Sequence, residues 1–310
     1  MLKDCAPENY AIVFPGQGSQ SLGMLGDLAG KYATVIETFH EASQVLGYDL
    51  WDVVQHGPVE KLNGTEVTQP ALLTASVSLW KIWRSNVGVE PKFLAGHSLG
   101  EYTALVCAES ITFADAIKLV ENRGKLMQKA YGNSGAMVAI VGLEDDVIAN
   151  ICKEVGQYGI LEVANYNSVG QTVLAGELTA AHEAIRLAKE QNAKVAKILP
   201  VSVPSHCSLM KPAATELAEL LQYIKFSSPR IPVIHNVDVV CHNEVKMISE
   251  VLVRQLYSPV RWVETVRFMI EKGVTNIIEC GPGKVLTGLN KRINSDVVAD
   301  SVLRHCEERA

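Results

Sequence analysis

The chain has 310 residues, of which 48% are hydrophobic and 20% charged, so it can bury a large core in one or two domains. A net charge of -6 without a dense Lys/Arg block disfavours nucleic acid as the main partner. Apolar runs stay far below the roughly 20 residues of a membrane-spanning helix, and the first residues lack a signal-peptide core, so we expect a cytoplasmic protein outside the membrane. The seven cysteines form no CxxC pair, which predicts neither a disulfide framework nor a zinc site.

The N-terminal part begins with a predicted buried strand and continues with amphipathic helices. Residues Tyr10–Phe14 are apolar and end at Pro15–Gln20, a polar loop with two glycines. Loops after buried strands commonly carry functional residues in α/β proteins. Apolar residues then recur at helical spacing over 30–46 and 68–87, which predicts two helices.

A glycine-flanked serine follows the next predicted strand. The apolar run Phe93–Gly96 leads through His97 and Ser98 into a helical pattern that begins at Leu99. Strand, tight turn and helix are the context of a nucleophile elbow, where glycines beside the central residue permit the sharp reversal. The sequence therefore makes Ser98 the candidate nucleophile, with a chance GxSxG match as the alternative.

The following helix, which begins after Thr112, directs an arginine toward the core. Its apolar stripe includes Val120 and Met127, and Arg123 stands where the stripe should continue between them. Burial of a guanidinium is costly unless an anion binds it. Two explanations stay open: an internal ion pair, which spacing alone favours, and a bound anionic ligand.

The pattern changes after residue 132. The next residues read as strands at 136–141, 161–164, 172–175 and 194–199 and helices at 144–155 and 179–191. This β-α-β-β-α-β order is typical of a ferredoxin-like domain. The remaining chain predicts helices at 210–223, 244–256, 262–272 and 284–293, and strands within 231–240 and at 275–279. We therefore predict an α/β fold with a discontinuous large domain, residues 1–132 and 201–310, and an inserted small domain, residues 133–200.

A serine nucleophile needs a neighbouring base, which is usually histidine. His206 follows an apolar run halted by Pro204 just before a helix, a rigid position for an imidazole, and His235 is its rival. We expect His97 to point to the other side of the elbow. No Asp or Glu between Ser98 and His206 falls at a predicted strand end, so a backbone carbonyl could orient the base in place of a carboxylate.

Two amides are candidate donors to the oxyanion of a tetrahedral intermediate. The N–H of Leu99 lies at a helix start, directly after the nucleophile. Gln17 or its loop could supply the second donor.

Five motifs occur in order along the chain: Phe14–Gln20, Gly96–Tyr102, Asn122–Gly124, Pro204–Cys207 and Gly281–Lys284. In these motifs and their order the sequence resembles malonyl-CoA:acyl carrier protein transacylases of bacterial fatty-acid synthesis, from about residue 10 to about residue 295. The resemblance implies an α/β-hydrolase-like large domain, a ferredoxin-like insert and an active site in the cleft between them.

The resemblance also implies roles for residues. Ser98 would be acylated, His206 would act as base and then acid, and Arg123 would bind the malonyl carboxylate. The main-chain carbonyl of Gln255 would orient His206. The remaining implied positions are the oxyanion donors Gln17 and Leu99 and the supporting residues Asn236 and Met127, while His235, where the family often has asparagine, is unassigned.

The implied function is that of an acyl-carrier-protein S-malonyltransferase, which works through a malonyl-serine intermediate and has malonyl-CoA and acyl carrier protein as partners. The expected enzyme needs no metal or prosthetic group and is a monomer. Acidic acyl carrier protein should be steered by basic residues near the cleft, for which Lys194, Lys197, Lys284 and Arg292 are candidates. The alternatives are a serine hydrolase, a thioesterase or carboxylesterase, with the same serine and histidine, and a non-catalytic subunit of a synthase.

Overall fold

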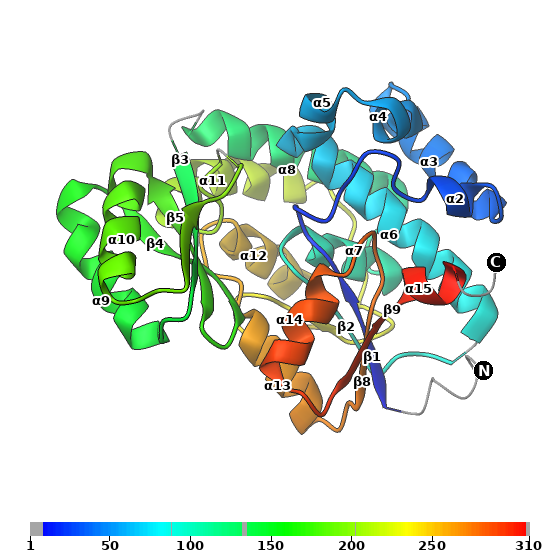
Figure 1. Ribbon diagram of the computed structural model, residues 1–310. Coiled ribbons are helices and arrows are strands. Elements are labelled where there is room, and N and C mark those ends of the chain that lie inside the picture. Colours follow the sequence, from blue (N-terminus) through cyan, green and yellow to red (C-terminus); the bar gives the residue numbers. More distant parts are fainter. Residues whose placement is uncertain (1–8, 88, 132–134, 202, 308–310) are drawn as a thin grey trace.

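The computed structural model describes residues 9–87, 89–131, 135–201 and 203–307. It contains a parallel sheet flanked by helices and a smaller antiparallel sheet set to one side (Figure 1). The large sheet has the order β7-β2-β1-β8-β9 and comprises β1 (Tyr10–Phe14), β2 (Phe93–Gly96), β7 (Val233–Ile234), β8 (Asn276–Glu279) and β9 (Val298–Ser301). Every strand pair in it is parallel.

Helices cover both faces of the large sheet. Their bounds are α2 (Gly26–Ala29), α3 (Ala33–Leu46), α4 (Leu50–His56), α5 (Val59–Asn63), α6 (Thr65–Val87), α7 (Leu99–Cys107), α8 (Phe113–Tyr131), α11 (Lys211–Leu221), α12 (Val245–Gln255), α13 (Trp262–Glu271), α14 (Val285–Ile293) and α15 (Val302–Glu307). A short 3-10 helix, η2 (Ser208–Met210), precedes α11.

The central strand β1 shows why this sequence is buried on both sides. Ile12 and Phe14 join a core with α3, α6, α7 and α8, whereas Ala11 and Val13 pack against α13 and α14 on the opposite face. Successive side chains of a strand point to opposite faces, so a continuous apolar run suits a strand between two helical layers.

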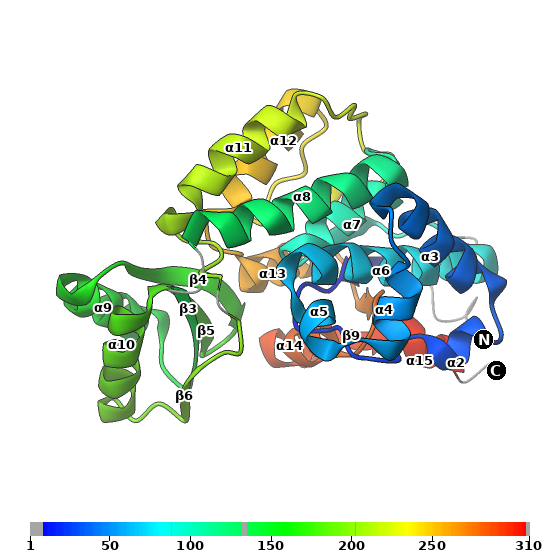
Figure 2. The same cartoon turned by 90° about the horizontal axis from the view of Figure 1, so that it is seen from above.

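The insert is a four-stranded antiparallel sheet with two helices on one face (Figure 2). Its order is β4-β5-β3-β6, and its elements are β3 (Gly135–Val141), α9 (Asp145–Val155), η1 (Gly156–Tyr158), β4 (Leu161–Ser168), β5 (Gln171–Glu177), α10 (Leu178–Glu190) and β6 (Val195–Ile198). The second strand in the chain therefore lies at one edge and the fourth at the other, as in a ferredoxin-like domain. The predicted first residues of the insert, 133 and 134, lie outside the described residues.

Two of the hydrogen bonds that attach the insert to the large domain join backbone groups of β4 and the segment before α13. The N–H of Val260 donates to the carbonyl of Ala164 at 2.8 Å, and the N–H of Tyr166 donates to the carbonyl of Val260 at 3.0 Å. Strand β4 is thereby held against the start of α13, which places one edge of the small sheet beside the C-terminal ends of the large sheet. Among the described residues, no helix combines the length and apolar character needed to cross a bilayer.

Candidate active site

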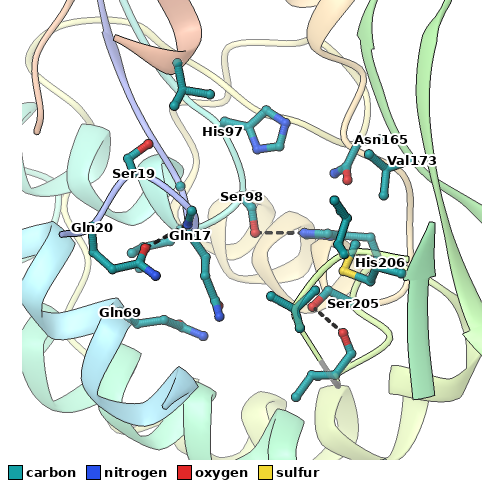
Figure 3. Close-up of a pocket in the computed structure, with 18 of the residues that line it drawn as sticks. Gln17, Ser19, Gln20, Gln69, His97, Ser98, Asn165, Val173, Ser205 and His206 are labelled. Carbon is teal, nitrogen blue, oxygen red and sulfur yellow. Dashed lines mark hydrogen bonds between the residues drawn. The ribbon is translucent and has the colours of Figure 1, made fainter. Parts of the chain in front are cut away.

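A cavity of about 340 Å³ lies between the two sheets. Ser98 and His206 line it from the large domain, and Met137, Asn165 and Val173 line it from the insert. Figure 3 shows the labelled side chains converging from both parts on the space in front of Ser98. The C-terminal ends of parallel strands are where α/β sheets commonly bind ligands.

The serine occupies a strained turn between β2 and α7. Its backbone has φ 52° and ψ −107°, outside the usual regions for a residue with a side chain. A Cβ on Gly96 would lie 1.8 Å from the carbonyl carbon of Gly100, and a Cβ on Gly100 would lie 2.0 Å from the carbonyl oxygen of Phe14. Gly96 is therefore required for the tight turn of the elbow itself, and Gly100 is required for the elbow to approach β1 so closely.

Substitution Gly96→Ala is expected to destabilise the protein by roughly 3 kcal/mol or more, because backbone rather than a flexible side chain occupies the space of the new methyl group. Denaturant unfolding measures the effect. The matched control is Gly288→Ala in α14, where nothing lies within 4 Å of an added Cβ and the stability should be unchanged or slightly raised. Equal stability of the two variants would contradict this account of the elbow.

His206 lies beside the serine and is oriented by the end of a helix. Its Nδ1 is 2.7 Å from the main-chain oxygen of Gln255, and its Nε2 is 2.7 Å from Ser98 Oγ. A carbonyl can only accept, so Nδ1 carries the proton and the Nε2 lone pair faces the serine hydroxyl. The carbonyl is free for this bond because it belongs to the last turn of α12, where helix carbonyls lack intrahelical donors.

Burial and the nearby charge of Arg123 lower the pKa of His206 to about 3. Because the pKa is depressed, the neutral imidazole that can accept a proton persists well below pH 6.5. We expect kcat/KM for serine acylation to show no loss from histidine protonation between pH 5 and pH 8. The measurement is CoA release from malonyl-CoA across this range, and an inflection near pH 6.5 that belongs to His206 would contradict the shift.

Arg123, from the middle of α8, is 1% exposed and faces the serine. It donates to Gln69 Oε1 at 2.8 Å, to Gln255 Oε1 at 3.0 Å and to Ser98 Oγ at 3.3 Å. Its guanidinium lies 5.2 Å from the ring centre of Tyr102. Among the residues that the structure describes, no carboxylate forms an ion pair with it, so the internal ion pair favoured from spacing is wrong. Neutral amide oxygens hold the arginine at the cavity.

Comparison with known proteins agrees with this geometry. The family model of the acyl transferase domain matches residues 11–300. The malonyl CoA-acyl carrier protein transacylase of Haemophilus influenzae is 55% identical over 297 residues, 95% of this chain and 95% of that protein. The chain belongs to the malonyl CoA-acyl carrier protein transacylase family. The motif resemblance is thereby confirmed.

Solved structures of this transacylase family share the whole fold. The malonyl CoA-acyl carrier protein transacylase of Coxiella burnetii has a TM-score of 0.95 and 49% identity, covering 97% of this chain and 98% of that one. A malonyl-transacylase in complex with its type II PKS acyl carrier protein has a TM-score of 0.93 and 53% identity, covering 97% and 100%. The predicted α/β fold with an inserted small domain is confirmed.

The two predicted oxyanion donors, Leu99 and Gln17, both line the cavity. Leu99 is the first residue of α7, where backbone N–H groups lack intrahelical acceptors. Gln17 follows β1 and lines the cavity. Its loop is held by the N–H of Gly18, which donates to Gln20 Oε1 at 2.8 Å, and by Gln20 Nε2, which donates to Asn63 Oδ1 at 2.9 Å.

The supporting residues fall in two places. Asn236 Oδ1 accepts the N–H of Ser98 at 2.8 Å, and its Nδ2 donates to the carbonyl of Gly96 at 2.6 Å, which clamps the elbow. Met127 lines the cavity one helical turn after Arg123. The rival base, His235, is buried and bonded to Glu101 at 2.7 Å, whereas His206 contacts the serine hydroxyl.

The expectation for His97 is wrong, and two polar residues were missed. His97 lines the cavity, and its Nε2 lies 2.8 Å from Oδ1 of Asn167, so the pair joins the elbow to the insert. The local turn geometry gave no sign of a partner 70 residues away. Gln69, the arginine's acceptor, sits inside the predicted helix 68–87 and carried no motif signal. Within the described part of the chain, no cluster of three or more His, Cys, Asp or Glu could hold a metal.

Proposed function

We propose that the protein transfers malonyl groups from malonyl-CoA to the phosphopantetheine thiol of acyl carrier protein. The observation that supports this most strongly is the buried Arg123, which has amide partners and points at the space in front of Ser98. A fixed guanidinium beside a nucleophile suits an acyl group with a terminal carboxylate, because guanidinium and carboxylate form two parallel charge-assisted hydrogen bonds.

In the first half-reaction, the malonyl carboxylate binds Arg123 and the thioester carbonyl lies before Ser98. Nε2 of His206 takes the hydroxyl proton as Oγ attacks the carbonyl carbon. The oxyanion accepts hydrogen bonds from the N–H groups of Leu99 and Gln17. The carbon–sulfur bond breaks, and His206 returns the proton to CoA as it leaves, so that malonyl-serine remains.

The second half-reaction reverses these steps with another thiol. CoA departs, and the phosphopantetheine thiol of acyl carrier protein gives its proton to His206 as the sulfur attacks the ester carbonyl. Collapse of the intermediate releases malonyl-acyl carrier protein and returns the proton to Ser98. The two half-reactions form a ping-pong mechanism, and their atoms and protons balance without a metal or prosthetic group.

The partner's docking surface is proposed at the mouth of the cavity. Lys194, Lys197, Lys284 and Arg292 are all exposed, and Lys284 immediately precedes Val285, a cavity-lining residue. A basic rim would attract an acidic carrier protein and raise its association rate.

Three more properties of the chain are proposed. The large domain comprises residues 1–132 and 201–310, the chain is a monomer, and it acts in the cytoplasm. Sedimentation velocity tests the monomer.

The competing function is serine hydrolysis, in which water replaces the carrier thiol at the acyl-enzyme. Incubation with malonyl-CoA alone separates the two reactions. A transacylase releases about one CoA per active site and then stops until acyl carrier protein is added, because its acyl-enzyme waits for a thiol. Continuous CoA release over many turnovers without acyl carrier protein would make the protein a thioesterase.

A further inference from the structure

One buried carboxylate close to the elbow has no role in the mechanism described above. Glu101, in the first turn of α7, is 0% exposed. Its Oε1 accepts a hydrogen bond from Nδ1 of His235 at 2.7 Å. Its Oε2 accepts the N–H of Asn236 at 3.0 Å and the side-chain amide of Gln255 at 2.8 Å. Three donors fix this carboxylate in one place.

The donors that Glu101 holds are themselves bonded to the reacting groups. Asn236 accepts the N–H of Ser98 at 2.8 Å, and Gln255 Nε2 donates to the carbonyl of Ser98 at 3.0 Å. Gln255 Oε1 accepts from Arg123 at 3.0 Å, and its main-chain oxygen accepts from His206 at 2.7 Å. The nucleophile, the base and the arginine are thus each connected to this one carboxylate through a single intervening residue.

We infer that Glu101 is a positioning residue for acyl transfer, which acts through Gln255 and Asn236 to set the relative places of nucleophile, base and arginine. The inference rests on the proposed function for the identity of the acyl group, and on geometry for the rest. Its physical reason is that Gln255 has a rotatable side chain, and the bonds from its amide nitrogen to Glu101 and to the carbonyl of Ser98 hold its oxygen toward Arg123.

A different role is the supply of negative charge to balance Arg123, and two substitutions separate charge from position. Glu101→Gln keeps the length without the charge. The oxygen of the new glutamine can accept hydrogen bonds from Asn236 and Gln255, and its NH2 group can donate to Nδ1 of His235. That last bond requires the ring proton of His235 to move to Nε2, which is possible because Nε2 has no partner among the described residues. Glu101→Asp keeps the charge but withdraws the carboxylate by about 1.5 Å, one carbon–carbon bond.

The measured quantity is the rate at which Ser98 reacts, divided by the concentration of sites that react. Stopped-flow CoA release from malonyl-CoA gives acylation, and labelling by a fluorophosphonate gives the serine's reactivity without any acyl preference. We expect Glu101→Asp to slow both by about 10- to 100-fold, as misplacement by an ångström does, and Glu101→Gln to stay within about threefold of the unchanged chain. If the unchanged chain is labelled but not acylated, the proposed function fails while the test of Glu101 stands.

Two further variants complete the experiment. Glu279→Asp is the matched control, because Glu279 is also 0% exposed and its carboxylate accepts from Thr287 rather than from the serine's neighbours. Gln255→Met removes the linking amide but keeps the carbonyl that orients His206, and must slow labelling as Glu101→Asp does, which covers the case in which the aspartate variant does not fold. The inference is overturned if Glu101→Gln is as slow as Glu101→Asp, if Glu101→Asp matches Glu279→Asp, or if Gln255→Met reacts normally.

Discussion

Ser98→Ala should reduce malonyl transfer by on the order of 10⁴- to 10⁶-fold, the largest effect of any single change in this chain. Ser98 Oγ is the atom that His206 Nε2 faces at 2.7 Å and that Arg123 approaches at 3.3 Å. Removal of the hydroxyl leaves the histidine and arginine without a nucleophile between them. Intact mass spectrometry after mixing with malonyl-CoA should show one added malonyl group on the unchanged chain and none on the variant.

The control for this prediction is the fold of the variant, read from its circular dichroism and melting temperature. Alanine is expected to relieve little of the strain at φ 52°, because the strain lies in the backbone and not in the hydroxyl. A malonyl adduct on the Ser98→Ala protein would place the acyl group on another residue and remove Ser98 from the mechanism.

Arg123→Ala should lower malonyl transfer by about 100-fold or more while transfer of acetyl falls little or rises. Loss of a buried charge-assisted bidentate pair costs about 2 to 4 kcal/mol, and acetyl has no carboxylate to form one. The contrast arises because the arginine binds the end of the acyl group that differs between the two substrates. Rates of serine acylation by malonyl-CoA and acetyl-CoA, measured side by side, give the ratio.

A matched variant, Arg123→Lys, keeps the charge but not the fork of donors that now reaches Gln69, Gln255 and the serine. We expect it to recover only part of the malonyl rate. An equal fall of both substrates in Arg123→Ala would show instead that the arginine serves the structure, through the amides that it orders.

Much of the fold was predictable because its signals are local. The run Tyr10–Phe14 is β1, and the run Phe93–Gly96 followed by a helix at Leu99 is β2 and α7. Short elements were missed where periodicity is too brief to read: α2, α4, α5, and the C-terminal β9 and α15. Strand β9 has only four residues and is stabilised by pairing with β8, a contact that no local pattern contains.

The candidate site likewise has features that neighbouring residues specify and features that depend on residues far apart in the chain. A nucleophile elbow is specified by neighbours in the chain, so Ser98 could be found from two glycines and the flanking apolar runs. Helical spacing predicts the inward direction of Arg123. It cannot predict the hydrogen-bond partners of the guanidinium, because Gln69 and Gln255 are 54 and 132 residues away in the chain.

The sequence by itself determined the order of the longer elements, the nucleophile and the buried position of the arginine, since each depends on spacing within one element. Spacing left His206 and His235 open, and the family resemblance implied His206 with the carbonyl of Gln255. The tertiary structure places Nε2 of His206 against the serine and Nδ1 against that carbonyl. It alone decided that Glu101 accepts a hydrogen bond from the side-chain amide of Gln255. Those relations join residues up to 154 positions apart. They exist because the parallel sheet brings the ends of distant strands and helices to one edge.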